Sequence, residues 1–341
     1  MEQLIDFHAP EVQAVLDTLL KDRSTGKNII WATDPPEELQ TVMYEPVTDR
    51  SQITTQQLGL THYEVVLPRM MKQTDTQQQR TRKKGEVFSP AWVCNKMNNA
   101  LDADWFRGLG AEESAGQFTV ELPQGWNTVE TPVQFPVCKG RIPAWVQYVQ
   151  SRRLEVTCGE APFLASRYDA ATGEMIPVAR RIGILDRKLR VVSENTATED
   201  EWRKYATHAV QSTYGYEYQG DNLLLARVNL LLTYRGHKKV GAVPGAQGSA
   251  VHERVCRPPF GHRAGQVPQD HAIYRCTSAG KAPETGSPAE RQGAGQGEST
   301  GFRSSTAEPL AGRTGAVESI CTFNCGKVRK SFSIIVRGDV Y

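Results

Sequence analysis

The first regular pattern along the chain is a helical spacing of apolar residues after Pro10. Proline is well tolerated in the first turn of a helix, and glycine often follows the last turn. The pattern therefore predicts a helix from Pro10 to near Gly26. Its apolar face would consist of Val12, Val15, Leu16, Leu19 and Leu20.

A second helix is predicted where Ser89 and Pro90 stand side by side. Serine is a preferred N-cap residue, and proline is favoured at the first helical position. The helical spacing then continues through Val93, Met97 and Leu101. We therefore expect Ser89 to cap a helix that begins at Pro90.

Helical and strand-like segments alternate between residues 144 and 234. The predicted order is a helix at Trp145–Gln150, a strand at Leu154–Val156, a helix at Glu199–Ser212 and a strand at Tyr214–Glu217. Residues 222–234 then form a helix that is apolar on nearly every side, so we expect it to be buried. This alternation predicts a parallel sheet covered by helices.

Three stretches give weaker patterns. Residues 106–143 contain many Gly and Pro and are expected to be irregular. The charges of Asp186–Arg190 are interpreted as a solvated run, with phosphate contact by Arg187, Lys188 and Arg190 as the alternative. The basic run Arg80–Lys84 is either a solvated linker or a contact to the DNA backbone.

Composition divides the chain near Arg235. Residues 1–235 hold 26 Lys and Arg against 30 Asp and Glu, whereas residues 236–341 hold 14 against 8. The second part has one leucine, Leu310, and 16 of the 29 glycines, which is too little apolar surface to offset the entropy of ordering the backbone. We expect the helix to end at Arg235 and the rest to be disordered. A reading-frame change or a foreign fusion would explain the break, and a naturally disordered tail is the alternative.

Several classes of protein are disfavoured. No stretch of 18 apolar residues is present, and the start of the chain lacks the apolar core of a signal peptide. The seven cysteines are scattered and odd in number, which favours a reducing compartment. Cys321 and Cys325, with Cys256 and Cys276, lack the paired spacing of a zinc site. We expect a cytoplasmic protein with no metal site and no membrane contact.

Three segments carry residues suited to a nucleoside ligand. A strand ending in an acid and a glycine turn, Leu154–Ala161, lets the backbone approach a ligand at the carboxyl edge of the sheet. The next strand ends at Glu217, whose carboxylate could accept hydrogen bonds from ribose hydroxyls. The turn Phe88–Pro90 could pack an aromatic ring over the ligand.

The same segments resemble restriction–modification DNA adenine-N6 methyltransferases, the restriction endonuclease subunit M family. Lys84–Val93, with the Gly85–Val93 signature, resembles the G-E/x-F/Y-x-T/S-P-x-x-V pattern of that family. Leu154–Leu164 resembles its D-P-x-C-G-S-G-x-F-L cofactor loop, and Tyr214–Leu230 its G-x-E segment with the A-x-x-N-L helix. The three segments follow the family's order, and the resemblance extends from Trp31 to Tyr234.

The resemblance implies a Rossmann-like, S-adenosylmethionine-dependent core that is incomplete, within an α/β chain. The expected domains are a largely helical or irregular region at 1–140, a partial methyltransferase core at 141–235 and a low-complexity tail at 236–341. The resemblance implies DNA and a restriction or specificity subunit as partners. The cofactor-binding residues that it implies are Phe88, Pro90, Glu155, Thr157, Cys158, Gly159, Ala161 and Glu217.

The sequence departs from the family in two places. Glu160-Ala161-Pro162 replaces the usual Ser-Gly-Gly, which makes the cofactor loop stiffer and more acidic. The catalytic Asn/Asp-Pro-Pro-Tyr/Phe, which would hold and stack the flipped adenine, is absent. Asp34–Glu37 lacks the aromatic residue, and Cys256–Phe260 has Arg257 where an acceptor is needed. The catalytic residues therefore stay unknown, and we expect weak or absent methyl transfer by this chain alone.

Two other functions remain open at this point. The first alternative is a non-catalytic DNA-binding or specificity component of a restriction complex. A nicotinamide-dependent enzyme built on the same sheet is disfavoured, because the loop is not G-x-G-x-x-G.

Overall fold

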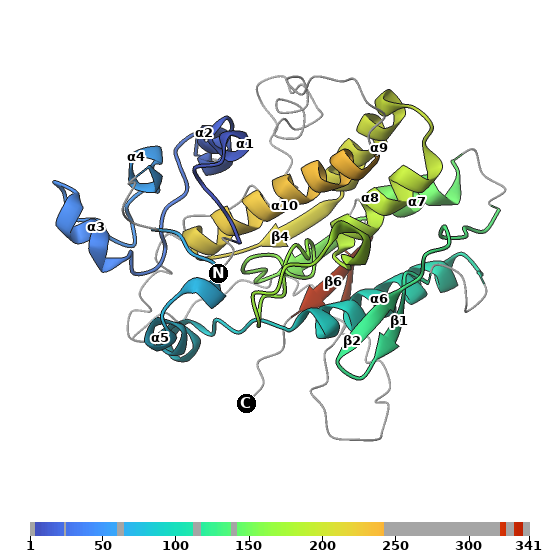
Figure 1. Cartoon of the computed structure of the whole chain (residues 1–341), viewed down its shortest axis with the longest axis horizontal. Helices are drawn as coiled ribbons and strands as arrows, with labels where there is room; N and C mark the ends of the chain where they lie inside the picture. The colour runs from blue at the N-terminus through green and yellow to red at the C-terminus, as the bar shows by residue number, and fades with distance from the viewer. Residues whose placement is uncertain are drawn as a thin grey trace, which may run out of the picture.

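The computed structural model describes residues 4–23, 25–59, 65–111, 117–137, 142–241, 321–324 and 331–336. These residues form a mixture of helices and short strands, with one four-stranded sheet and one two-stranded hairpin (Figure 1). The helices are α1 (Pro10–Gln13), α2 (Leu16–Leu20), α3 (Glu37–Val42), α4 (Thr55–Leu58), α5 (Thr74–Lys84), α6 (Ala91–Gly108), α7 (Ala144–Gln150), α8 (Ile184–Asn195), α9 (Glu199–Gln211) and α10 (Gly220–Gly241), with 3-10 turns at Arg69–Met71 and Val178–Arg180. The strands are β1 (Thr119–Leu122), β2 (Gly125–Thr128), β3 (Arg153–Val156), β4 (Thr213–Tyr216), β5 (Cys321–Asn324) and β6 (Ser331–Val336).

The four-stranded sheet has the order β4-β3-β6-β5. β3 runs parallel to β4, with Val156 opposite Tyr216, and also parallel to β6, with Val156 opposite Val336. β5 pairs with β6 in the antiparallel direction. The sequence-based prediction of parallel strands alternating with helices is therefore confirmed for β3 and β4.

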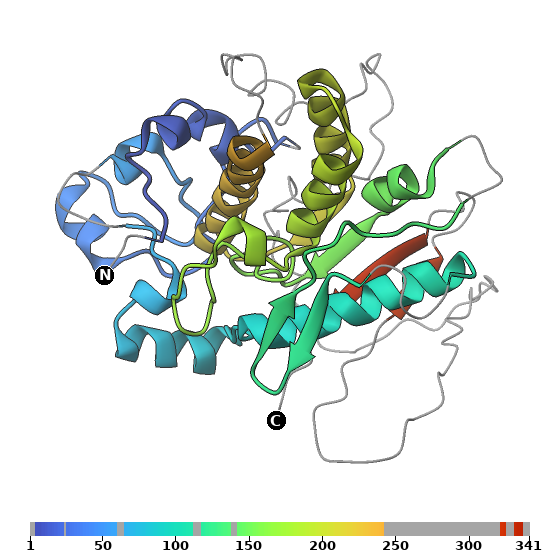
Figure 2. The ribbon, with the colours of Figure 1, turned by 45° about the vertical axis from the view of Figure 1, so that its right-hand side comes forward.

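Helices lie on both sides of this sheet. α9 and α10 lie on one side of β6, and α6 lies on the other, with the β1–β2 hairpin beside it (Figures 1 and 2). The hairpin falls within residues 106–143, which were expected to be irregular, so that expectation is wrong for these eight residues. Each of its strands is only four residues long, which leaves too few positions for an alternating pattern to be recognised.

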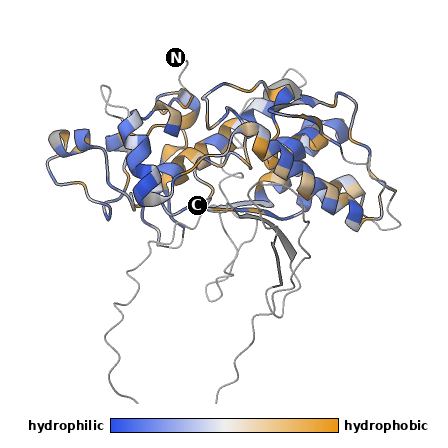
Figure 3. Ribbon diagram, turned by 90° about the horizontal axis from the view of Figure 1, so that it is seen from below, coloured by the Kyte–Doolittle hydropathy of each residue, from blue (hydrophilic) through white to orange (hydrophobic). Residues whose placement is uncertain are grey.

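α10 lies between two hydrophobic clusters. Ala226, Leu230 and Tyr234 belong to the cluster that includes α6, α8 and α9. Leu223–Leu225, Val228 and Leu231 belong to a second cluster with the N-terminal helices and strand-like segments. Figure 3 shows hydrophobic residues gathered in the central helices and hydrophilic ones on the outer helices. The predicted burial of α10 is confirmed, because both hydrophobic clusters pack on it.

α10 does not end at Arg235, as was expected, but continues to Gly241. The additional turn packs against α8 and α9. His237 Nε2 lies 3.0 Å from Asp186 Oδ1, and Lys238 Nζ lies 3.2 Å from Glu199 Oε1. These contacts keep the helix regular past Gly236, so the break in composition at residue 235 is not the end of the element.

Within residues 236–341, the structure describes two strands, β5 and β6, which join the sheet. β6 contains Ser331-Phe332-Ser333-Ile334-Ile335-Val336, an apolar run that is short enough to be hidden in the average composition of the tail. Residues 242–320 lie outside the described residues, as does the near-match Cys256–Phe260.

The charged run that begins at Asp186 is buried rather than solvated. Asp186, Arg187 and Lys188 are at most 2% exposed. Arg187 Nη1 donates to Asp102 Oδ2 on α6 at 2.6 Å, and Lys188 Nζ donates to Ser151 O at 2.6 Å. Buried charges are tolerated when they are paired and hydrogen-bonded, and here they join α8 to α6 and to the start of β3. The interpretation of this run as solvated is therefore wrong.

Candidate functional site

The loop after β3 turns sharply over the carboxyl end of the strand. Thr157, Gly159 and Ala161 all have left-handed backbones, with φ of 53°, 55° and 64°. Such a conformation costs a non-glycine residue about 1–2 kcal/mol. The loop is fixed to the neighbouring strand because the Cys158 amide donates to Tyr216 O at 2.8 Å. The sequence therefore places a tight, strained turn at the edge where parallel strands end.

Glu217 follows β4 directly and reaches across to this loop. The Gly159 amide donates to Glu217 Oε2 at 2.6 Å. The amides of Tyr218 and Gln219 each donate to Oε1 at 3.0 Å. Burial raises the pKa of Glu217, while these amides act in the opposite direction. The structure thus brings together the glycine turn and the acid that the sequence singled out separately.

The side chain and the backbone of Glu160 hold the loop in place through hydrogen bonds. Its Oε2 accepts from the Tyr168 hydroxyl at 2.6 Å, and its Oε1 accepts from the Arg69 amide at 2.5 Å. Asn229 on α10 donates to Glu160 O at 2.9 Å and to the Tyr168 hydroxyl oxygen at 3.1 Å. Burial raises the pKa of Glu160, and the bonds from Tyr168 and Arg69 oppose that shift. Sequence reasoning identified Glu160 only as a departure; the A-x-x-N-L segment that contains Asn229 was the available signal for its partner.

The segment around Phe88 joins the same region through Arg69. Phe88 is buried, and the Arg69 guanidinium lies 5.6 Å from the centre of its ring. Because Arg69 also binds Glu160 through its amide, Phe88 and the loop after β3 share a neighbour. Phe88 is therefore placed near the loop but within the packed interior.

The capping of α6 differs from the prediction. The helix begins at Ala91, one residue later than expected, and Pro90 is its N-cap. Ser89 does not cap it. Instead, Asp169 Oδ2 accepts from the Ala91 amide at 2.9 Å. Proline at the N-cap has an extended backbone, and a distant carboxylate supplies the charge-assisted bond that a helix N-terminus favours.

Four charged residues connect the segment around Phe88 to the start of α10. Lys72 Nζ lies 3.6 Å from Glu86 Oε1 and 3.3 Å from Asp221 Oδ2. Arg80 pairs with Glu86, and its Nη2 lies 3.0 Å from Asp221 Oδ2. Burial alone would raise the pKa of Asp221, but Lys72 and Arg80 outweigh it and hold that pKa below its ordinary value. Asp221 is four residues after Glu217, so the network anchors the Phe88 segment beside the candidate site.

The remaining predicted residues differ in exposure. Glu155 is fully buried on β3, opposite Gly215 and Ile335 of the flanking strands. Cys158 and Ala161 are buried, whereas Thr157 is exposed. Within the loop Thr157–Ala161, Thr157 is therefore the residue that faces solvent, and the four residues that follow it are buried. The upstream near-match Asp34–Glu37 lies at the start of α3.

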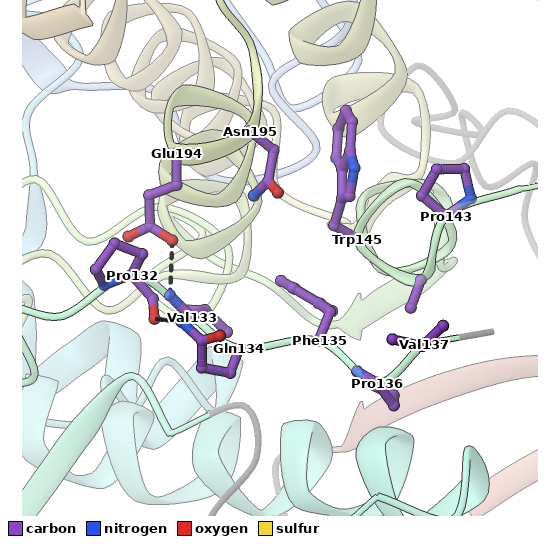
Figure 4. Close-up of a pocket in the computed structure, with 11 residues that line it drawn as sticks. Pro132, Val133, Gln134, Phe135, Pro136, Val137, Pro143, Trp145, Glu194 and Asn195 are labelled. Atoms are coloured by element: carbon purple, nitrogen blue, oxygen red, sulfur yellow. Dashed lines mark hydrogen bonds between the residues drawn. The ribbon is translucent and has the colours of Figure 1, made fainter.

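A separate hollow lies between the segment 132–137, α7 and the end of α8 (Figure 4). Phe135 and Trp145 line it, and Glu194 accepts from the Val133 amide at 2.9 Å. α7 precedes β3 in the chain, and α9 lies between α8 and β4. The hollow does not include any of the residues predicted to bind the cofactor.

Comparison with protein families, with curated proteins and with solved structures finds no match to this chain. In the part of the chain that the structure describes, no helix is long and apolar enough to cross a lipid bilayer. The described residues likewise contain no group of three His, Cys, Asp or Glu side chains that could hold a metal ion.

Proposed function

We propose that the loop Thr157–Ala161 and Glu217 bind S-adenosylmethionine. We further propose that the chain is the cofactor-binding part of a DNA adenine-N6 methyltransferase from a restriction–modification system, with a Rossmann-like core. The observation that carries this proposal is the 2.6 Å contact between the Gly159 amide and Glu217 Oε2. It joins two segments 58 residues apart in the sequence that resemble two parts of one cofactor site.

The position of these residues in the sheet supports a ligand site. In open α/β sheets, ligands bind beyond the carboxyl ends of the strands, where connections leave in opposite directions. β3 has β4 on one side and β6 on the other, so the loop after β3 stands at such a point. Glu217 leaves the adjacent strand at the same edge.

The chemistry of the residues fits a nucleoside. Each carboxylate oxygen can accept two hydrogen bonds, and Glu217 Oε2 accepts one from the described residues, so it retains capacity for a ribose hydroxyl. Gln219 is buried, and its Oε1 has no hydrogen-bond partner among the described residues. Leaving such an acceptor unsatisfied costs about 1–3 kcal/mol, which a ligand donor such as an amino group would offset. Tyr218, 58% exposed, offers an aromatic face beside them.

When bound, S-adenosylmethionine supplies a methyl group activated by its sulfonium. In this proposal Glu217 orients the ribose, and the left-handed loop lets the backbone approach the cofactor closely. Glu160 holds the loop through Tyr168 and Asn229 and does not contact the cofactor. Because the sequence lacks the Asn-Pro-Pro-aromatic segment, we propose weak or absent methyl transfer by this chain alone.

A non-catalytic DNA-binding or specificity component of a restriction complex is the second candidate. The observation that favours it is that the chain contains the proposed cofactor loop, whereas neither near-match to the catalytic segment combines an acceptor with an aromatic residue. Cofactor binding without methyl transfer would agree with this second candidate.

Isothermal titration with S-adenosylhomocysteine and with NAD tests the cofactor proposal. We expect binding of S-adenosylhomocysteine only, and weaker binding by about tenfold or more in Glu217→Gln, because bonds to a charged group are worth about 1.5–3 kcal/mol. Glu174→Gln changes an exposed carboxylate elsewhere and is the matched control. No binding of S-adenosylhomocysteine, or equal binding by Glu217→Gln, would contradict the proposal.

Incubation with tritiated S-adenosylmethionine and mixed DNA tests the activity. Little or no incorporation is expected. Robust incorporation would show that a complete catalytic site exists without the Asn-Pro-Pro-aromatic segment and would exclude the non-catalytic candidate.

A further inference from the structure

α5 is a helix without an aliphatic or aromatic side chain, with the sequence TDTQQQRTRKK. A helix that is polar on all sides is not held in place by hydrophobic packing. Two kinds of polar contact attach it instead. Arg80 pairs with Glu86 and Asp221, and the Thr81 hydroxyl donates to Glu86 O at 3.0 Å. The inner face of α5 is therefore fixed to the segment that leads to Phe88 and to the start of α10.

The outer face of α5 is exposed and carries four side chains in two rows. Gln78 and Arg82 are one helical turn apart, as are Gln79 and Lys83, so the four share one face. None of these four side chains has a hydrogen bond or ion pair with the described residues. Asp75 is also exposed on this face, one turn before Gln79. The face therefore offers two cations, one carboxylate and two amides, and each amide can both donate and accept.

The charge of this region contrasts with that of its surroundings. Residues 69–84 contain six basic residues and one acidic residue, Asp75. The first 235 residues as a whole hold more acidic than basic residues. Lys72 and Arg80 are neutralised by Glu86 and Asp221, so Arg82 and Lys83 are the described cations of this stretch that face solvent.

We propose that the outer face of α5 binds the backbone of duplex DNA, with Arg82 and Lys83 on phosphates and Gln78 and Gln79 directed at base edges. Phosphates attract exposed cations, and glutamine amides match the donor and acceptor pattern of adenine in the major groove. This inference rests on the proposed function, because it assigns a surface to the DNA substrate. The Arg80–Asp221 pair attaches the inner face of α5 to the start of α10, so the outer face is directed away from this contact.

Fluorescence anisotropy with a labelled 20-base-pair duplex, measured over a range of salt concentrations, tests this proposal with the full-length chain. The variant Arg82→Glu/Lys83→Glu is compared with Lys27→Glu/Arg50→Glu, which changes the net charge equally at two other exposed positions. We expect the α5 variant to lose about tenfold or more in affinity, and its log–log salt slope to fall by about 2, because each lost phosphate contact removes about one unit. The control variant should keep both values close to those of the unchanged protein.

Equal losses in the two variants would attribute binding to net charge and overturn the proposal, as would the absence of DNA binding by the unchanged protein. Titration of both variants with S-adenosylhomocysteine separates this outcome from failure of the cofactor site. If Arg82→Glu/Lys83→Glu binds S-adenosylhomocysteine normally and its affinity for DNA is unchanged, the proposal for α5 is wrong and the cofactor proposal is unaffected. A further outcome is that neither the unchanged protein nor the variants bind S-adenosylhomocysteine while the α5 variant alone loses affinity for DNA. That result would support the DNA surface on α5 and reject the cofactor proposal. Binding of an acidic protein in place of DNA would also overturn the proposal that α5 binds DNA.

Discussion

The side chain of Glu217 is buried enough to titrate differently from an exposed glutamate. Burial raises its pKa, and the amides of Gln219, Gly159 and Tyr218 only partly compensate. In the proposed site a ribose hydroxyl donates to the ionised carboxylate, so protonation of Glu217 would compete with the ligand. The proposal therefore links proton binding and cofactor binding at this residue.

We predict that affinity for S-adenosylhomocysteine falls as the pH is lowered through the raised pKa of Glu217, a fall that begins at a higher pH than an ordinary glutamate would give. Titrations at several pH values between about 4.5 and 8 measure it, within the range where the protein stays folded. In Glu217→Gln the weak remaining affinity should change little over this range, while Glu174→Gln should follow the unchanged protein. A pH profile identical in all three proteins would contradict the assignment.

Gly215 on β4 tests the packing beneath the loop. A Cβ at this position would lie 2.9 Å from Cys158 Sγ and 3.3 Å from Leu164 Cδ1, so the loop would have to shift. We predict that Gly215→Ala lowers the free energy of unfolding by about 1–3 kcal/mol, the usual cost of overpacking, and weakens cofactor binding. Gly125→Ala is the control, because nothing lies within 4 Å of its Cβ position. Urea unfolding of the two variants measures the difference, and equal midpoints would show that β4 and the loop are not in contact.

Some site residues could be found from the sequence, and others could not. Glu217 and Gly159 were predicted because each follows a recognisable strand, and parallel strands end at one edge of a sheet. The roles of Glu160 and Asn229 depend on a contact between residues 69 positions apart. Such a contact is set by how α10 packs, and no local pattern encodes it.

A buried ion pair joins α8 to α6. A second ion pair, with the same distance between nitrogen and oxygen, lies at the surface of the molecule. Arg187 Nη1 lies 2.6 Å from Asp102 Oδ2 in the interior, and Arg107 Nη1 lies 2.6 Å from Asp104 Oδ1 at the surface. Removing one partner of a buried pair costs about 3–5 kcal/mol, because the other charge stays buried, whereas an exposed pair contributes about 0–1 kcal/mol.

Arg187→Met should therefore lower the free energy of unfolding by about 3–5 kcal/mol, and Arg107→Met by less than about 1 kcal/mol. Chemical denaturation followed by circular dichroism provides both values. If Arg187→Met folds but is no less stable than Arg107→Met, the burial of the α8 charges is wrong.

The same elements show why patterns succeed for some segments and fail for others. α9 follows a clear helical periodicity, and the structure reproduces the predicted bounds of α9 and of β3 to within one residue. The charges of α8 resembled a solvated run because their partner, Asp102, lies on a helix far away in the sequence. α10 passes Gly236 because His237 and Lys238 have partners on α8 and α9, which the local sequence does not reveal.

The last part of the chain contributes two strands, β5 and β6, to the four-stranded sheet. β6 lies between β3 and β5, so it is a central strand. Proline removes a backbone donor and is poorly tolerated in such a strand. Ile334→Pro should therefore destabilise the protein by about 3 kcal/mol or more. Ile334→Val keeps the amide and a β-branched side chain, and should cost less than about 1.5 kcal/mol. Thermal unfolding compares the two variants, and a neutral Ile334→Pro would show that β6 does not contribute to the stability of the sheet.

In the proposed site, the turn after β3 and the residues after β4 bind the same nucleoside. Hydrogen exchange of the full chain, with and without saturating S-adenosylhomocysteine, tests this proposal segment by segment. We predict slower exchange both in peptides that cover residues 156–161 and in peptides that cover residues 214–219. Protection of only one of these segments, or protection confined to the hollow lined by Phe135 and Trp145, would contradict it.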